Sequence, residues 1–274
     1  HQGARLETVI DAALREELKN LAQRQGVTLF VVLLAAFKTL LHRYSGQTDI
    51  RVGGLIANRT RSETEGLIGF FVNTQILRSV VTAQTPFTEL LQNLRQAALG
   101  AQAHQDLPFD ALIEALQPAR SQSHNPLFQV MFNHQPLVTD LHQAQLASGL
   151  RVGYLSEEQL AGSARQHAAT SDLMLDTREE GEQLFAAFTY ATDIFDASTI
   201  AALAGHWRNI LQSVCRDPQQ LIGEVAMLAD SERHGLIQAT APAPRFTSVQ
   251  SLFEAQVART AQAPAVRLAT APAP

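Results

Sequence analysis

The sequence predicts an α/β domain in which a mixed sheet is flanked by helices, and three observations support this prediction. Segments with helical and with strand-like apolar spacing are interspersed along the chain, which is typical of layered α/β domains rather than of bundles or sandwiches. Apolar residues make up 46% of the 274 residues, so a sizeable core can form. No repeat of long period is found, which argues against a repeat architecture.

Two helices are expected near the start of the chain. Leucines recur at helical spacing over residues 11–25, and Gly26 suits the end of that helix. Thr28 can cap a second helix that ends near residue 45. This second helix is apolar almost all round, so it should be covered on most sides.

The middle of the chain alternates strands and helices. Strands are expected over residues 50–57 and 68–81, separated by a charged loop. Helices should begin at Thr85-Pro86 and around Asp106-Leu107-Pro108, because proline is tolerated in a first helical turn.

The later part predicts more strands and one long helix. The strands are expected at residues 127–133, 150–155, 171–177 and 184–190. The last two read as a hairpin that turns at Glu179-Glu180-Gly181. A long helix should follow, capped by Asp196 or Ser198 and stopped by Asp217-Pro218.

Composition argues against several functional classes. The net charge of −5 gives no basic face for nucleic acid. Cys215 is the only cysteine, so an internal disulfide is impossible, and a reducing cytoplasm is the expected location. The longest apolar run, residues 29–41, contains Lys38 and is too short to cross a bilayer, and no secretory leader is expected.

Common catalytic and metal-binding motifs are missing from the sequence. No Gly-x-Ser-x-Gly elbow, phosphate-binding loop or Gly-x-Gly-x-x-Gly fingerprint occurs. The nine histidines are scattered without metal-ligand spacing, so no metal site is expected. Gly53-Gly54 is read as a place of close packing or a strand end rather than as a ligand loop.

Three short segments carry the most specific pattern. They are Ile68-Gly-Phe-Phe-Val-Asn-Thr74, His104-Gln-Asp-Leu-Pro-Phe-Asp110 and Asn125-Pro-Leu-Phe128. In this order and spacing they resemble the carboxy-terminal lobe of a condensation domain from a nonribosomal peptide synthetase. The resemblance extends from about Leu6 to Leu228. It implies one lobe, residues 1–230, of a chloramphenicol-acetyltransferase-like (CoA-dependent acyltransferase-like) two-lobed fold.

The remaining residues predict a junction with another domain. Residues 231–247 read as a Pro/Ala linker. Residues 248–274 open with an amphipathic helix and resemble the start of an adenylation domain. The hexapeptide at residues 239–244 recurs at residues 269–274, and nothing physical explains the duplication.

The resemblance implies a reaction and a set of partners. Condensation domains form an amide bond between a donor thioester and an acceptor amine, each tethered to phosphopantetheine on a peptidyl carrier domain. No cofactor is expected to bind this chain directly. The family's His-His-x-x-x-Asp-Gly base motif is absent from these residues, so an amino-terminal lobe should supply it. Alone, the chain is expected to be inactive.

The resemblance also suggests residues for a substrate channel. Asn125 is the best candidate for its lining, with a pre-proline turn as the alternative. Ser121 and His124 depart from the family's acid and base at those positions, and a hydrogen bond between the two could substitute for a charged contact. Asn73 is a candidate polar wall group, or a residue that satisfies neighbouring backbone groups. His134 could face the donor channel or lie in the core or at an edge.

Other motif residues have structural interpretations. Arg59 could contact the other lobe, or it could belong to a solvated loop. His104 is interpreted as a structural residue. Asp106 should cap the helix that follows it, and Pro108 should fix the first turn of that helix.

Alternative functions share parts of this pattern. An epimerisation domain has the same fold, although the adenylation-like segment argues against it. A non-catalytic condensation-like module that recruits partner proteins is compatible with the changes at Ser121 and His124. A free-standing acyltransferase is less favoured because of the downstream segment. Residues 58–61 and 133–135 resemble the family subtype that takes a D-configured donor residue.

Overall fold

The structure is a computed structural model that describes residues 2–59, 61–118, 125–136, 167–238 and 248–262. The chain forms two compact units, residues 1–229 and residues 230–274. The first unit contains the sheet, and the second contains two helices, so each is treated by itself.

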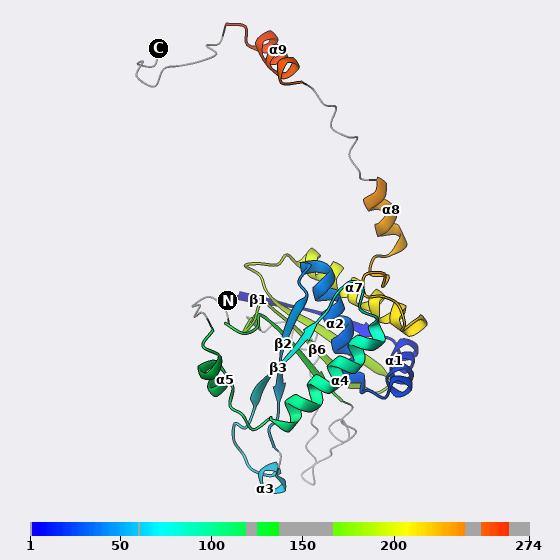
Figure 1. Cartoon of the computed structure of the whole chain (residues 1–274), viewed down its shortest axis with the longest axis vertical. Helices are drawn as coiled ribbons and strands as arrows, with labels where there is room; N and C mark the ends of the chain where they lie inside the picture. Colours follow the sequence, from blue (N-terminus) through cyan, green and yellow to red (C-terminus); the bar gives the residue numbers. More distant parts are fainter. Residues whose placement is uncertain (1, 60, 119–124, 137–166, 239–247, 263–274) are drawn as a thin grey trace, which may run out of the picture. The chain divides into compact units, whose positions relative to one another are not determined.

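A seven-stranded mixed sheet forms the centre of the first unit, which confirms the α/β prediction (Figure 1). The strands are β1 (Gln2–Ile10), β2 (Asp49–Ile56), β3 (Asn73–Val80), β4 (Val130–Gln135), β5 (His167–Ala168), β6 (Leu173–Glu180) and β7 (Gln183–Ala191). They lie in the order β3-β2-β4-β6-β7-β1-β5. The β2–β4 and β4–β6 pairs are parallel, and the others are antiparallel.

Six described helices accompany the sheet in the first unit, and two further described helices form part of the second unit. They are α1 (Ala12–Gln25), α2 (Leu29–Ser45), α3 (Ser62–Glu65), α4 (Phe87–Ala103), α5 (Phe109–Leu116) and α7 (Ala197–Arg216), followed by α8 (Asp230–Gln238) and α9 (Val249–Arg259). One large core joins α1, α2, α4 and α7 to one face of the sheet, here called the helix face. A smaller cluster joins α5 to the opposite face.

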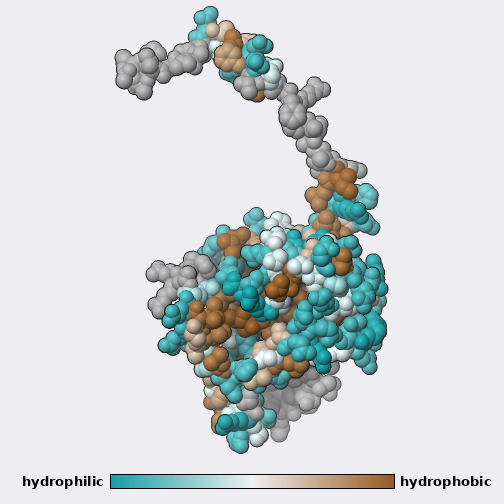
Figure 2. All heavy atoms as spheres, viewed as in Figure 1, coloured by the Kyte–Doolittle hydropathy of each residue, from teal (hydrophilic) through white to brown (hydrophobic). Residues whose placement is uncertain are grey.

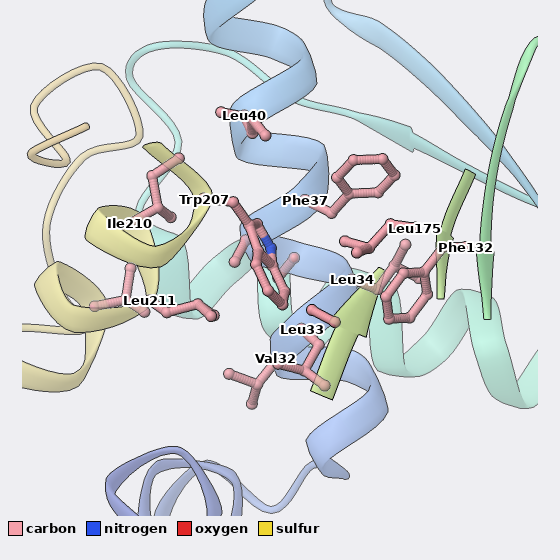
Figure 3. Close-up of a cluster of buried hydrophobic side chains, with 14 of the residues drawn as sticks. Val32, Leu33, Leu34, Phe37, Leu40, Phe132, Leu175, Trp207, Ile210 and Leu211 are labelled. Carbon is pink, nitrogen blue, oxygen red and sulfur yellow. The ribbon is translucent and has the colours of Figure 1, made fainter. Parts of the chain in front are cut away.

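Helix α2 runs through the middle of the large core (Figure 3). Trp207 of α7 lies against it, while Phe132 and Leu175 approach from the strands. Trp207 and Phe37 are fully buried, and Phe132 is nearly so. The prediction that this apolar helix is covered on most sides is therefore confirmed.

Lys38 is a charged exception inside this core. Its side chain is 0% exposed, and Nζ donates to the Ile50 carbonyl (3.1 Å), the Leu77 carbonyl (2.6 Å) and Ser79 Oγ (3.0 Å). Burial lowers the pKa of this amine to about 7. Lys38 thus ties α2 to both β2 and β3, and its amine has three acceptors inside the core.

Packing in the smaller cluster explains why residue 53 is glycine. Leu127, Phe128 and Met131 are buried against α5 on the face opposite the helix face. A Cβ atom on Gly53 would lie 2.6 Å from the Phe128 ring. The close-packing interpretation of Gly53 is therefore confirmed.

The local signals for the first two helices are confirmed. Thr28 Oγ1 accepts a hydrogen bond from Val31 N (3.4 Å), as predicted. Asp11 Oδ1 accepts one from Leu14 N (3.0 Å), which makes Asp11 the cap of α1 rather than its first helical residue. Gly26 ends α1 in the left-handed conformation, with φ 64°. Each of these caps acts within a few residues, which is why the sequence shows them.

Several expectations need correction. Strand β1 was not predicted, and the strand expected from residue 68 begins at Asn73, because residues 68–72 belong to the preceding loop. The first half of the expected Pro/Ala linker is helix α8, which contains no proline. The strand expected at residues 150–155 and the rest of the linker lie outside the described residues.

Candidate functional site

The motif residues gather around the carboxyl ends of the parallel strands β2 and β4 and around the turns that precede α5 and β4. In parallel sheets this edge is where loops collect and where ligands are commonly bound.

Arg59 organises the loop that leaves β2. Its guanidinium donates to the Thr64 and Glu65 carbonyls and lies 4.3 Å from the centroid of the Phe71 ring. Both the hydrogen bonds and the cation–π contact hold the loop in one conformation. The expected contact with another lobe stays a prediction, and it would compete with these local partners.

The same loop presents apolar side chains to solvent. Ile68 is 104% exposed and Phe70 is 90% exposed. Leu67 and Val72 are also exposed, so residues 67–72 are named the apolar loop. Figure 2 shows apolar atoms gathered on the visible face around α5 and the β2–β3 pair. Large exposed apolar groups of this kind mark interaction surfaces.

Asn73 satisfies three backbone groups at the turn before α5 and one backbone N–H of β3. Nδ2 donates to the carbonyls of Gln105 (3.0 Å) and Leu107 (2.7 Å). Oδ1 accepts from Thr74 N (2.9 Å) and Phe109 N (3.2 Å). Of the two interpretations of Asn73, the structure supports the backbone-satisfying one, and its role as a channel wall group stays a prediction.

The cap expected from Asp106 is wrong. Among the described residues, no backbone N–H of α5 donates a hydrogen bond to the Asp106 carboxylate. Phe109 N donates to Asn73 Oδ1 instead. Pro108 occupies the N-cap position with φ −62°, so it does restrain the chain where α5 begins. His104 is the exposed C-cap residue of α4, and its carbonyl accepts from Leu107 N (3.2 Å).

Asn125 forms a local turn before β4. Its Oδ1 accepts hydrogen bonds from Leu127 N (2.9 Å) and Phe128 N (3.4 Å), so its side chain mimics a backbone turn. The pre-proline turn is thus shown, and the channel-lining role stays a prediction. His124 and Ser121 lie outside the described residues.

His134 lies in a buried polar cluster on the helix face. Its side chain is 6% exposed, with Nδ1 2.9 Å from Thr177 Oγ1 and Nε2 3.9 Å from a Glu179 carboxylate oxygen. Burial lowers the pKa of His134, although the negative charge of Glu179 opposes this change. The structure therefore supports the core placement of His134, and its role at a donor channel stays a prediction.

Glu179 is held in this cluster by two cations of α1. Its Oε2 lies 2.7 Å from both Arg15 Nη2 and Lys19 Nζ. Burial alone would raise the pKa of Glu179, but the hydrogen bonds from Lys19 and Arg15 outweigh it and lower the pKa. The cluster thus fixes α1 against β6 with a charged carboxylate.

The bridging role of Asn133 was not predicted, although residues 133–135 had been singled out in the sequence. Asn133 lies beside His134 but faces the other side of the sheet. Its side chain connects β2 to β6, with Oδ1 3.0 Å from Leu55 N and Nδ2 3.0 Å from Asp176 Oδ1. The available signal was the polar run Asn133-His134-Gln135, which follows three apolar residues of the same strand.

No group of three potential metal ligands occurs within the described ranges. A cavity of about 500 Å³ lies between the start of α2, α4 and β3, and its wall is mainly apolar. None of the predicted site residues that the structure describes lines that cavity.

No single described helix is long and apolar enough to cross a membrane. Helices α1 and α2 pass such a test only as a pair bent by 102°, and α2 is a buried core helix.

Comparison with protein families decides the relationship. The family described as Condensation domain matches residues 1–237. The chain belongs to this condensation domain family. One of the linear gramicidin synthase subunits from Brevibacillus parabrevis is 42% identical over 266 residues, covering 96% of this chain and 3% of that protein. Surfactin synthase subunit 1 from Bacillus subtilis is 35% identical over 94% of this chain and 7% of that protein.

Solved structures show the same fold as this condensation-family chain. The X-domain from teicoplanin biosynthesis has a TM-score of 0.73 and 25% identity, covering 83% of this chain and 50% of that chain. The first condensation domain of the CDA synthetase has a TM-score of 0.66 and 18% identity, covering 83% and 48%. The chain therefore spans about half of each of these solved chains and a few per cent of the curated relatives.

Proposed function

We propose that this chain is the carboxy-terminal lobe of a condensation domain and acts in a nonribosomal peptide synthetase module. One observation carries the proposal: 83% of the chain aligns with only 48–50% of solved condensation-type and X-domain chains. The exposed apolar loop supports it, because such a surface would be covered by a second lobe.

The proposed reaction is amide formation between two tethered substrates. The acceptor amine attacks the donor thioester carbonyl, so that a C–N bond forms and the C–S bond breaks. The amine gives up one proton, and the thiolate that leaves takes up one. Phosphopantetheine on each carrier domain would supply the thioester attachment.

The chain's own contribution would be positioning. It would form one wall of the reaction channel, with Asn125 and Asn73 fixing the turns at its edge. Holding two reactants in line can account for several kcal/mol of barrier lowering, of a possible ~7–11 kcal/mol. The general base would come from the other lobe, so the chain alone should form no product.

We also propose that residues 248–274 begin an adenylation domain. Helix α9 supports this, because Leu252 and Phe253 are exposed on it and would be buried by a larger domain. Residues 231–247 would then connect the two domains, with α8 as the first part of the connection.

The function is tested by combining this chain with an amino-terminal condensation lobe that carries the His-His-x-x-x-Asp-Gly motif. Donor and acceptor carriers are loaded, and the dipeptidyl thioester is measured by mass spectrometry. Product should form only when both lobes are present. No product with verified loading and a stable complex of the lobes would overturn the proposal and favour a recruiting module.

A further inference from the structure

The apolar cavity on the helix face is large enough to hold a small molecule. It has a volume of about 500 Å³ and lies between the start of α2, the second half of α4 and the strands β2 and β3. Pockets that bind small molecules usually have volumes of ~300–1,000 Å³. The apolar part of the wall includes Phe30, Val31, Ile56, Leu77 and Leu99.

Several of these apolar side chains are incompletely covered. Phe30 and Ile56 are only partly buried, although Phe30 packs against the large core and its ring centroid lies 5.5 Å from that of Phe132. Leu99 is 50% exposed. Removal of apolar surface from water is favourable in proportion to its area, so the cavity suits a ligand with an apolar group.

The wall of the cavity also carries a cation. Among the residues that line it, all of which belong to the described part of the chain, Arg95 is the only charged one, and it is exposed. Within the described ranges, the guanidinium of Arg95 has neither a hydrogen bond nor an ion pair. A guanidinium presents a planar set of donors that matches a carboxylate, so Arg95 favours a ligand whose polar end is a carboxylate.

Two glutamines connect the cavity to the hydrogen bonds that hold the end of α4 on β3. Gln75 lines the cavity, and its Nε2 donates to the Ala101 carbonyl (2.6 Å). Gln105 also lines it, and its carbonyl accepts from Asn73 Nδ2 (3.0 Å). A molecule in the cavity would therefore contact residues that fix α4 and the turn before α5.

We propose that this cavity binds a free aliphatic carboxylate, a small molecule with an apolar tail and one anionic end. The tail lies against Phe30, Ile56 and Leu99, and Arg95 donates hydrogen bonds to the carboxylate. Binding is reversible and involves no covalent step, so it does not depend on the amide-forming reaction proposed above. The bound molecule also stiffens the connection between α4 and the turn before α5.

The direct test is calorimetric titration of the 274-residue chain with hexanoate, octanoate and decanoate at neutral pH. Each added pair of methylene groups should lower the Kd about 10- to 15-fold, since a buried CH₂ group contributes ~0.8 kcal/mol. Decyltrimethylammonium has the tail of decanoate and a cationic end, so it should bind more weakly than decanoate. No saturable binding of decanoate at millimolar concentration, or a Kd that is independent of tail length, would overturn the proposal.

Charge reversal tests the role of Arg95. Arg95→Glu should raise the Kd for decanoate at least 3-fold and lower the Kd for decyltrimethylammonium, because the pairing of charges at the rim is reversed. Arg216→Glu makes the same change in net charge at the exposed end of α7 and should alter neither affinity. The same preference for decanoate in all three proteins would contradict the site.

Filling the cavity tests its position. Ala98→Phe places a ring in the cavity and should abolish decanoate binding, whereas Gln96→Phe adds the same ring to an exposed part of α4 outside the cavity and should leave binding unchanged. Leu99→Ala is a milder second variant and should raise the Kd about 3-fold. Thermal melting verifies that each variant is folded. Undiminished binding to folded Ala98→Phe or to Leu99→Ala would place the ligand elsewhere.

Two further measurements separate a small-molecule site from other uses of the cavity. Saturating decanoate should slow hydrogen exchange at the backbone amides of Leu107 and Phe109, in the turn that Gln105 helps to fix. Its affinity should stay within 2-fold when an amino-terminal condensation lobe is added. Loss of decanoate binding in the presence of that lobe would assign the cavity to the contact between lobes and overturn the proposal, while the proposed function would stand.

Discussion

The two faces of the sheet are built in different ways. On the helix face, large apolar side chains from α2 and α7 interlock with those of the strands, and the core residues Trp207 and Phe37 are fully buried (Figure 3). On the opposite face and its loops, order depends on asparagine side chains that replace main-chain hydrogen bonds: Asn73, Asn125 and Asn133. The helix face stabilises the fold, whereas the other face holds irregular backbone in place beside an exposed apolar loop.

The largest expected effect comes from the helix face. Trp207→Ala removes a fully buried side chain and should cost about 3–5 kcal/mol of unfolding free energy, because it loses burial and leaves a cavity. Phe70→Ala is the matched change on the apolar loop and should stay within about 0.5 kcal/mol. Urea denaturation measures both. Comparable losses for the two variants would erase the contrast between the faces.

The second effect concerns close packing across β2. Gly53→Ala places a methyl group 2.6 Å from the Phe128 ring and should destabilise the chain by about 1–3 kcal/mol through overpacking. Gly100→Ala in α4 meets no atom within 4 Å and should instead stabilise by about 0.5–1 kcal/mol. The melting temperatures of the two variants should therefore move in opposite directions, and a shared direction would contradict the packing account.

The third effect sharpens the role of the asparagines. Asn73→Ala leaves Phe109 N and two turn carbonyls without their partner and should cost about 1–2 kcal/mol. Hydrogen exchange should become faster at Thr74 and in the first turn of α5, and not elsewhere in α5. Asp106→Ala is the control and should leave exchange in α5 unchanged. Faster exchange in α5 of the Asp106→Ala variant would contradict this account and support Asp106 as the cap of α5.

The smallest effect is a pH dependence on the helix face. The folded-state pKa of His134 is lowered from 6.5, so below that pH the unfolded chain binds a proton that the folded chain resists. Stability should therefore fall as the pH drops below about 6.5, by at most ~1.4 kcal/mol per pH unit.

His134→Gln should remove this part of the pH dependence, and His104→Gln at the exposed end of α4 should retain it. Denaturant midpoints measured between pH 7.5 and 5.5 provide the comparison. The same pH slope in both variants would place the titrating group elsewhere.

Local signals explain what could be predicted from the sequence. The cap at Thr28 and the stop at Gly26 act within one turn of the helices that they bound. The apolar composition of α2 was enough to predict its burial, and Gly53 was correctly interpreted as a packing residue. Patterns of this kind need no knowledge of distant residues.

Features that depend on distant residues were not predicted. Strand β1 is defined by pairing with β7, more than 170 residues away. Asn73 bonds the first turn of α5 from 36 residues away, and the nearer Asp106 was chosen instead. Lys38 was visible as a charge in an apolar run, but its acceptors lie on two strands that only the fold brings together.

The proposal that this chain is half of a catalytic unit is tested most directly by calorimetric titration with an amino-terminal condensation lobe. A 1:1 complex is predicted, with a negative heat-capacity change from apolar burial and an affinity reduced at least tenfold by Phe70→Asp. The absence of any complex, or a complex that Phe70→Asp leaves unchanged, would contradict the assignment of the apolar loop to the contact between lobes.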